Sequence, residues 1–134
     1  MTSKEVIIDF FNSDIANDIG VIEKFYHKDC EVHWNSSQGY KFRGFNDTVE
    51  FFKGITESYD SLRFQLSHLL EDNNVVTARY TLYASTIETE DEIPLAHYVT
   101  IIELKDNKFF RVYDMSQPAD SETLNTNTFT KIKS

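Results

Sequence analysis

The stretch that decides the fold is VTIIELKDNKFFRVYDM, residues 99–115. Side chains of a β-strand point alternately to its two faces, and two alternating apolar runs flank the turn-forming residues KDNK, which predicts a hairpin. In the second strand, Phe110, Val112 and Asp114 share one face. Two large apolar side chains mark this face as buried, so Asp114 places a carboxylate in an apolar row.

Two further strands precede this hairpin. SLRFQLSHLLE, residues 61–71, alternates apolar and polar side chains, and VVTARYTLYAST, 75–86, is rich in β-branched and aromatic residues. EDNN, 71–74, is typical of a turn, and the acidic ETEDE, 88–92, is typical of a solvated hairpin tip. Together with the hairpin, these strands predict a four-stranded antiparallel meander.

Three amphipathic helices are predicted ahead of the meander. Apolar residues recur every three or four positions over about 3–16, in a short segment after Asn17 or Asp18, and over about 47–59. CEVHWN, residues 30–35, alternates and predicts a short strand among them. Segregated helices and antiparallel strands indicate an α+β fold, in which helices on one face of a twisted sheet leave a concave side suited to a small ligand.

Composition limits the classes of partner. The 134 residues suffice for a single domain, 1–134, and the net charge of −9 disfavours nucleic acid and anionic membranes. One cysteine excludes an intrachain disulfide, and neither a signal peptide nor a membrane span is evident, so we expect a cytoplasmic protein. The polar tail, 117–134, contains TFTKI, 128–132, which can add an edge strand.

Four segments together resemble the SnoaL-like branch of the nuclear transport factor 2-like superfamily. They are NDIGVIEKFYHKDCEVHW (17–34), FRGFNDTVEFFKGI (42–55), LEDNNVVTARYTLYAS (70–85) and VTIIELKDNKFFRVYDM (99–115). The resemblance implies a cone-shaped roll of three N-terminal helices packed on a curved antiparallel sheet that encloses an apolar pocket, and frequent dimers. Members include ketosteroid isomerase, scytalone dehydratase, limonene epoxide hydrolase and polyketide cyclases, while others only bind, so the fold alone does not decide function.

The resemblance carries over to part of the site. Asp114 matches the acid–base aspartate of the SnoaL-like polyketide cyclases, whereas Thr100 stands where those cyclases have a histidine on the preceding strand. Trp34 stands where ketosteroid isomerase has its proton-shuttling aspartate, and the oxyanion-stabilising acid of that enzyme falls within a residue of Thr100. Strand phase and resemblance therefore agree on Asp114 alone.

Asp114 is the candidate catalytic residue, because desolvation in an apolar pocket raises the pKa of a carboxyl toward the range of efficient acid–base catalysis. The alternative is a strand-end carboxylate that lies near solvent or pairs with an arginine. Residues expected to share its pocket, each of which also suits ordinary core packing, are Trp34, Tyr80, Tyr98, Thr100 and Val112.

Other chemistry-bearing residues are weaker candidates. His33 and His97 suit acid–base work by residue type, although both are out of phase with the pocket. The equal spacing of His27, Cys30 and His33 does not aim three ligands at one point, so we expect no metal and no cofactor. Arg43 and Arg79 are candidates for receiving an acidic ligand, although Arg79 is out of phase with Tyr80 and is expected on the outer sheet face.

Two classes of function stay open. An enzyme of this kind would be a cofactor-independent isomerase, cyclase or lyase that acts on a small apolar or carbonyl-containing molecule, with Asp114 as general acid–base. The alternative is a non-catalytic module that binds a ligand or a protein, and the missing histidine favours it. We also expect a homodimer through the outer sheet face, which carries Thr77, Thr81, Tyr83, Val99, Ile101 and Tyr113.

Overall fold

The chain forms three helices and six strands within the described residues, 2–88 and 91–119, of a computed structural model. They are α1 (Ser3–Phe11), α2 (Gly20–Phe25), β1 (Tyr26–Ser36), β2 (Gly39–Arg43), α3 (Phe45–Ser58), β3 (Tyr59–Asp72), β4 (Val75–Thr86), β5 (Glu92–Lys105) and β6 (Lys108–Pro118). The edge strand predicted at 128–132 lies outside the described residues.

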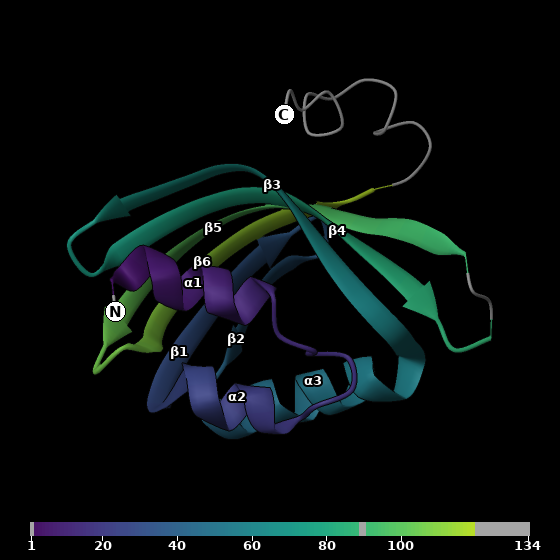
Figure 1. The fold of residues 1–134 in the computed structure, drawn as a ribbon, viewed down its shortest axis with the longest axis horizontal. Coiled ribbons are helices and arrows are strands. Elements are labelled where there is room, and N and C mark those ends of the chain that lie inside the picture. Colours follow the sequence, from purple (N-terminus) through teal and green to yellow (C-terminus); the bar gives the residue numbers. More distant parts are fainter. Residues whose placement is uncertain (1, 89–90, 120–134) are drawn as a thin grey trace.

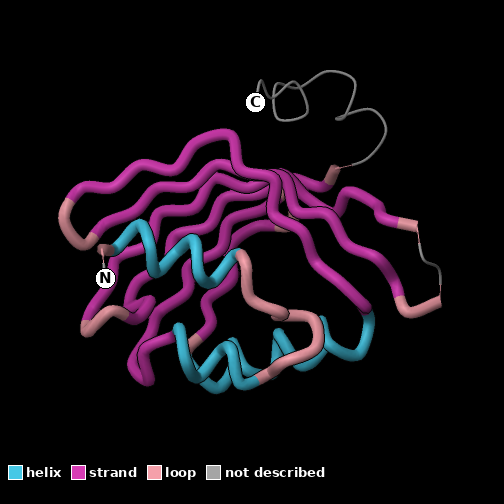
Figure 2. Tube along the Cα trace, in the orientation of Figure 1, coloured by secondary structure: helices cyan, strands magenta, loops and turns pink. Residues whose placement is uncertain are grey.

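One curved sheet holds all six strands, in the order β2-β1-β6-β5-β4-β3, and the helices lie on its concave side (Figures 1 and 2). Helix α1 contacts β3 and β4, whereas α2 and α3 contact β1. The predicted α+β class is therefore confirmed. No helix in the described part of the chain is long and apolar enough to cross a membrane.

The sheet is antiparallel except at one junction. The predicted meander of β3, β4, β5 and β6 is antiparallel throughout, but β1 pairs with β6 in parallel, and β2 extends the sheet antiparallel to β1. The expectation of a wholly antiparallel sheet is thus wrong at this junction. Its consequence for the site is that Trp34 lies beside Asp114 in register.

Helix α1 begins as predicted but is shorter. Thr2 Oγ1 accepts a hydrogen bond from the Glu5 N–H at 3.2 Å, and the Glu5 carboxylate accepts from the Thr2 N–H at 3.4 Å, which completes a capping box. The helix ends at Phe11, where Ser13 Oγ donates to a main-chain carbonyl and competes with helical bonding. Ile15 is nevertheless buried. Its helical spacing from the apolar residues of α1 therefore indicated correctly that it is buried, although it lies beyond the end of the helix.

A β-bulge in β6 interrupts the alternation of inward and outward side chains that the sequence predicts. Consecutive residues of β5 lie opposite Arg111 and Phe109, so Phe110 is the extra residue on β6. Phe109 therefore takes the buried position expected for Phe110, and Val112 and Asp114 keep the inward direction that the sequence predicts.

An aromatic cluster fills the closed end of the concave side. The Phe109 side chain is 1% exposed, and its ring lies edge-on to the rings of Phe10 and Tyr26, with centroids 5.0 Å and 4.9 Å away. Edge-to-face contacts at these separations are favourable beyond the area they bury. The cluster fixes helix α1 and strand β1 against β6.

The turn between β5 and β6 sets the register of the hairpin. Asp106 and Asn107 have φ angles of 55° and 60°, the left-handed pair that a two-residue type I′ turn requires. Asp and Asn tolerate this region better than other non-glycine residues. The KDNK segment therefore forms the tight turn that the sequence predicts.

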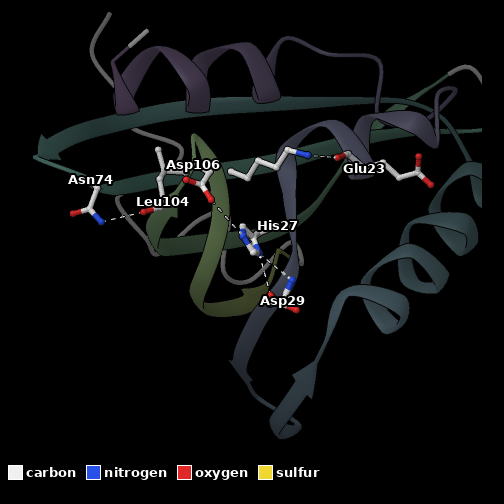
Figure 3. Close-up of polar contacts among 7 residues, drawn as sticks. Glu23, His27, Asp29, Asn74, Leu104 and Asp106 are labelled. Atoms are coloured by element: carbon white, nitrogen blue, oxygen red, sulfur yellow. Dashed lines mark hydrogen bonds and ion pairs between the residues drawn. The ribbon is translucent and has the colours of Figure 1, made fainter.

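Polar contacts hold this turn against the start of β1 (Figure 3). The Asp29 N–H donates to Nδ1 of His27 at 3.0 Å, so the proton of the neutral ring lies on Nε2, 3.8 Å from the Asp106 carboxylate. Lys108 Nζ donates to the Glu23 carbonyl at 3.1 Å. These contacts tie the base of β6 to β1 and to the end of α2.

The bulge predicts unequal costs for two neighbouring phenylalanines. Phe109→Ala should lower the free energy of unfolding by about 3–5 kcal/mol, because it leaves a cavity in the aromatic cluster. Phe110→Ala should cost clearly less, about 1–2 kcal/mol, because this side chain is only partly buried. Urea unfolding of both variants measures the difference, and a larger cost for Phe110→Ala would contradict the bulge.

Candidate functional site

A cavity of about 390 Å³ opens between the inner sheet face and helices α1 and α3. Its volume lies within the range of small-molecule sites. The apolar part of its wall comes from Phe10, Phe11, Phe51, Phe52, Ile55, Leu62, Phe64, Leu82, Leu95, Ala96, Ile102, Phe109 and Val112. The polar part comes from Tyr26, Arg43, Tyr59, Tyr80, Tyr98, Thr100 and Asp114.

Asp114 lies on this wall at the end of a chain of side-chain hydroxyls. Thr100 faces it across the β5–β6 ladder and donates from Oγ1 to Asp114 Oδ1 at 2.7 Å. Tyr80 Oη lies 3.1 Å from the same threonine oxygen. Since the single hydroxyl proton of Thr100 goes to Asp114, the Tyr80 hydroxyl donates to Thr100.

The second carboxylate oxygen of Asp114 is available to a ligand. No side chain in the described part of the chain donates to Oδ2, and Asp114 is partly accessible where it lines the cavity. One oxygen is thus held in place by Thr100, no side chain of the described residues holds the other, and the residue lines the space that a small molecule would occupy.

Burial raises the pKa of Asp114 from 3.8 to about 6. The hydrogen bond from Thr100 and the positive charge of Arg43 both act in the opposite direction, because each favours the carboxylate. Near neutral pH, the group is therefore mostly ionised yet close to its titration point. A carboxyl in this state can take up a proton and release it again.

The tyrosines around Asp114 are neutral hydrogen-bond donors. Burial, followed by the charge of Asp114, raises the pKa of Tyr98 to about 12 and also raises the pKa values of Tyr26 and Tyr80. The rings of Tyr80 and Tyr98 stack with centroids 5.2 Å apart and an interplanar angle of 7°. This pair forms a flat aromatic wall beside the carboxylate.

Four of the expected pocket residues line the cavity, and one does not. Tyr80, Tyr98, Thr100 and Val112 are part of the wall, as their strand phase predicts. Trp34 shares their face but lies outside the cavity. Its indole N–H donates to Ser116 Oγ at 2.8 Å, and its ring is covered by the side chains of Lys41 and Arg43.

Both candidate histidines lie away from the cavity, as their strand phase indicates. His33 stacks on Tyr113 on the outer face, with centroids 5.2 Å apart, and bonds to the Tyr40 hydroxyl. His97 is buried on the outer side, where it bonds to Thr81 Oγ1 at 2.8 Å. Burial lowers the pKa of His97, and the charge of Arg79 lowers it further. Neither imidazole contacts Asp114.

Among the described residues, Cys30 and the side chains of metal-ligand types are not grouped into a reactive centre. Burial raises the pKa of the Cys30 thiol, which favours the unreactive neutral form. Over residues 2–88 and 91–119, no three His, Cys, Asp or Glu side chains are grouped to hold a metal ion. His27 is engaged at the hairpin turn, far along β1 from His33.

The helical wall of the cavity is a feature that the sequence pattern did not predict. Phe10 and Phe11 of α1, and Phe51, Phe52 and Ile55 of α3, complete the space that the sheet leaves open. Phe51 and Phe52 are adjacent in sequence, which places aromatic rings on a wide sector of α3. Such a broad aromatic sector is the signal that could have indicated cavity lining instead of close packing.

The sequence of residues 7–112 matches the SnoaL-like domain family. The chain belongs to the SnoaL-like family. No curated protein matches the sequence. The identification agrees with the curved sheet, the helices on its concave side and the cavity between them.

Solved structures share the fold at low identity. IdmH of Streptomyces antibioticus, a proposed polyketide cyclase, has a TM-score of 0.69 at 8% identity, over 87% of this chain and 92% of IdmH. AclR of Streptomyces galilaeus, a proposed hydroxylase, has a TM-score of 0.70 at 15% identity, over 98% of this chain and 83% of AclR. TerC, crystallised with polyporic acid, has a TM-score of 0.61 at 19% identity, over 92% of this chain and 95% of TerC. At these identities the likeness shows the fold alone.

The raised pKa of Asp114 predicts a pH-dependent stability difference. Because its folded pKa exceeds the value of an unfolded chain, Asp114 destabilises the fold increasingly as the pH rises from 4 through 6. Asp114→Asn removes this cost. The free energy of unfolding of the variant, relative to that of the unsubstituted protein at the same pH, should therefore increase by about 1–3 kcal/mol between pH 4 and pH 7. Urea unfolding at both pH values measures the change. The exposed Asp60→Asn serves as a control, and an equal change in both variants would contradict the buried titration.

Proposed function

We propose that this chain binds a small, largely apolar molecule with a carbonyl group in the cavity and transfers a proton with Asp114 as general acid–base. The reaction class would be isomerisation, cyclisation or dehydration without a cofactor. One observation carries this proposal: Asp114 lines an aromatic cavity with one carboxylate oxygen held by Thr100, and its pKa is raised to about 6.

The proton transfer follows from this arrangement. Asp114 Oδ2 takes the proton from a carbon next to the carbonyl, so the C–H bond breaks, an O–H bond forms and the electron pair becomes an enolate. The neutral hydroxyl of Tyr98 is the donor suited to the enolate oxygen, since Tyr80 already donates to Thr100. Return of the proton to another carbon completes an isomerisation.

The comparisons support a small-molecule ligand. One structure of the same fold is a proposed polyketide cyclase, and TerC was crystallised with an organic acid. The stacked pair of Tyr80 and Tyr98 suits a planar ring system, which would lie parallel to it. We therefore favour a ligand with at least one flat ring.

A non-catalytic binding protein is the second candidate. The observation that favours it is Thr100, which stands beside Asp114 where the resemblance expects a histidine. A protein that only carries a ligand needs the cavity but no proton transfer. The open cavity supports a small ligand over a protein partner in both cases.

Hydrogen exchange at carbon separates the two candidates without knowledge of the natural substrate. In D₂O, the protein should accelerate exchange of the hydrogens next to the carbonyl of 2-tetralone, a flat-ringed ketone, as followed by proton NMR. Asp114→Asn should lower this rate by about 100-fold or more, because general base catalysis contributes on that order. Thr100→Val should lower it less, since the carboxylate remains.

The exposed Asp60→Asn is the matched control for this experiment and should exchange at the rate of the unsubstituted protein. An unchanged rate in Asp114→Asn would exclude the catalytic role of Asp114. Binding of the ketone without any accelerated exchange would favour the non-catalytic candidate.

The homodimer stays a prediction, and the exposed apolar residues of the outer face are the ones that its interface would bury. Exposed apolar side chains on the outer face gather on β5 and β6: Val99, Ile101, Tyr113 and Met115, the last 64% exposed. If a second copy covers this face, Ile101→Lys combined with Met115→Lys should convert a dimer into a monomer while thermal stability per chain changes little. Sedimentation equilibrium measures the mass, and a dimer that persists in the double variant would place the interface elsewhere.

A further inference from the structure

Arg43 occupies a defined position at the edge of the cavity. It is the last residue of β2, directly before Gly44, whose carbonyl begins the hydrogen bonding of α3. Its guanidinium carbon lies 4.0 Å from the ring centroid of Phe51 and 5.3 Å from that of Trp34. The two aromatic rings thus fix the position of the guanidinium, and Arg43 lines the cavity.

The Arg43 guanidinium makes no hydrogen bond to a protein group in the described part of the chain. Nε of Arg43 is buried and has no hydrogen-bond partner, and in the described part of the chain no carboxylate lies within ion-pair distance of the side chain. By contrast, Arg63 and Arg111 pair with glutamates. A buried charged donor without a partner is costly, so an unpaired one on a cavity wall indicates that its partner is a ligand.

Contact with the rings does not replace such a partner. The face of an aromatic ring attracts a cation electrostatically. This contact supplies no hydrogen-bond acceptor to the N–H groups of the guanidinium. Asp114 is near enough for the charge of Arg43 to lower its pKa, yet the two groups form no ion pair. The cavity therefore holds one cation and one titratable acid that do not neutralise each other directly.

We propose that Arg43 binds an anionic oxygen group of the ligand, a carboxylate or an ionised enol or phenol, so that the cavity takes an aromatic acid. This inference rests on the proposed function, since it assumes that the cavity binds a small molecule. The planar donors of the guanidinium match the two oxygens of a carboxylate, and the rings of Phe51 and Trp34 keep the donors oriented.

Two dyes with the same ring system test the proposal. 8-Anilinonaphthalene-1-sulfonate carries an anionic group, and N-phenyl-1-naphthylamine is its neutral counterpart. Trp34 is the single tryptophan and lies beside Arg43, so energy transfer from selectively excited Trp34 to either dye reports binding. Titrations of the whole chain give the two dissociation constants.

Arg43→Met should weaken binding of the anionic dye by about tenfold or more, because charge-assisted hydrogen bonds contribute on that order. The same variant should change binding of the neutral dye less than about twofold, as hydrophobic burial is kept. Arg43→Lys should fall between, since it keeps the charge and loses the planar donors. Arg111→Met, on the outer face, is the matched control and should leave both dyes unaffected.

The outcomes separate this inference from the proposed function. If neither dye binds the unsubstituted protein, the small-molecule site itself is contradicted, and the inference falls with it. If the neutral dye binds and the anionic dye is unaffected by Arg43→Met, the inference alone is overturned. Equal losses of both dyes in a folded Arg43→Met variant, as judged by near-ultraviolet circular dichroism, would also overturn it, because they would show a packing role.

The pH dependence supplies a second readout. The ionisable groups of the cavity wall are Arg43 on β2, Tyr26 on β1, Tyr59 on β3, Tyr80 and Tyr98 on β4 and β5, and Asp114 on β6. Burial raises the pKa of Asp114 to about 6, within the pH range of the titration. An anion at Arg43 repels the Asp114 carboxylate, so binding of the anionic dye should weaken as the pH rises from 5 to 7.5. In Asp114→Asn, and for the neutral dye, affinity should stay constant, and an equal pH dependence there would contradict the shared site.

Discussion

The hydrogen bond from Thr100 to Asp114 is the interaction on which the site depends. A carboxylate on the inner face of this sheet would be costly if none of its oxygens had a donor. Thr100 donates to one oxygen across the ladder, and Tyr80 in turn donates to Thr100, so side-chain hydrogen bonds hold the carboxylate at one oxygen only. The other oxygen is left to a ligand, which makes the carboxyl both tolerable and available.

The rest of the fold provides the alignment that this bond requires. The type I′ turn at 105–108 and the bulge at Phe110 together set the register in which Thr100 and Asp114 face each other. The same bulge turns Phe109 inward, where its ring packs against that of Phe10. One register therefore positions both the aromatic cluster and the Thr100–Asp114 pair.

Strand phase was sufficient to predict much of the site from sequence. Tyr80, Tyr98, Thr100, Val112 and Asp114 all face the cavity because the meander is regular where they lie. The failures have two origins. The parallel β1–β6 pairing and the helical wall of the cavity depend on residues far apart in the chain. The bulge that replaces Phe110 by Phe109 and the contact of Arg43 with Trp34 lie between neighbouring strands, where alternation alone specifies neither the register nor the side-chain contacts.

The charges of the cavity explain why this arrangement differs from an ordinary core. A protein selected only for stability would pair Arg43 with Asp114 or replace both by apolar residues, since breaking up a buried charge pair is costly and a well-packed apolar substitute is often more stable. Here the acid is held by a hydroxyl and the guanidinium by two aromatic rings, so each is positioned without neutralising the other. Two opposite charges on one apolar cavity wall, not paired with each other, make the two ends of a polar ligand inequivalent in the cavity. A bound molecule that presents an anionic oxygen to Arg43 would be oriented in the cavity, and that orientation decides which of its carbon–hydrogen bonds can reach Asp114.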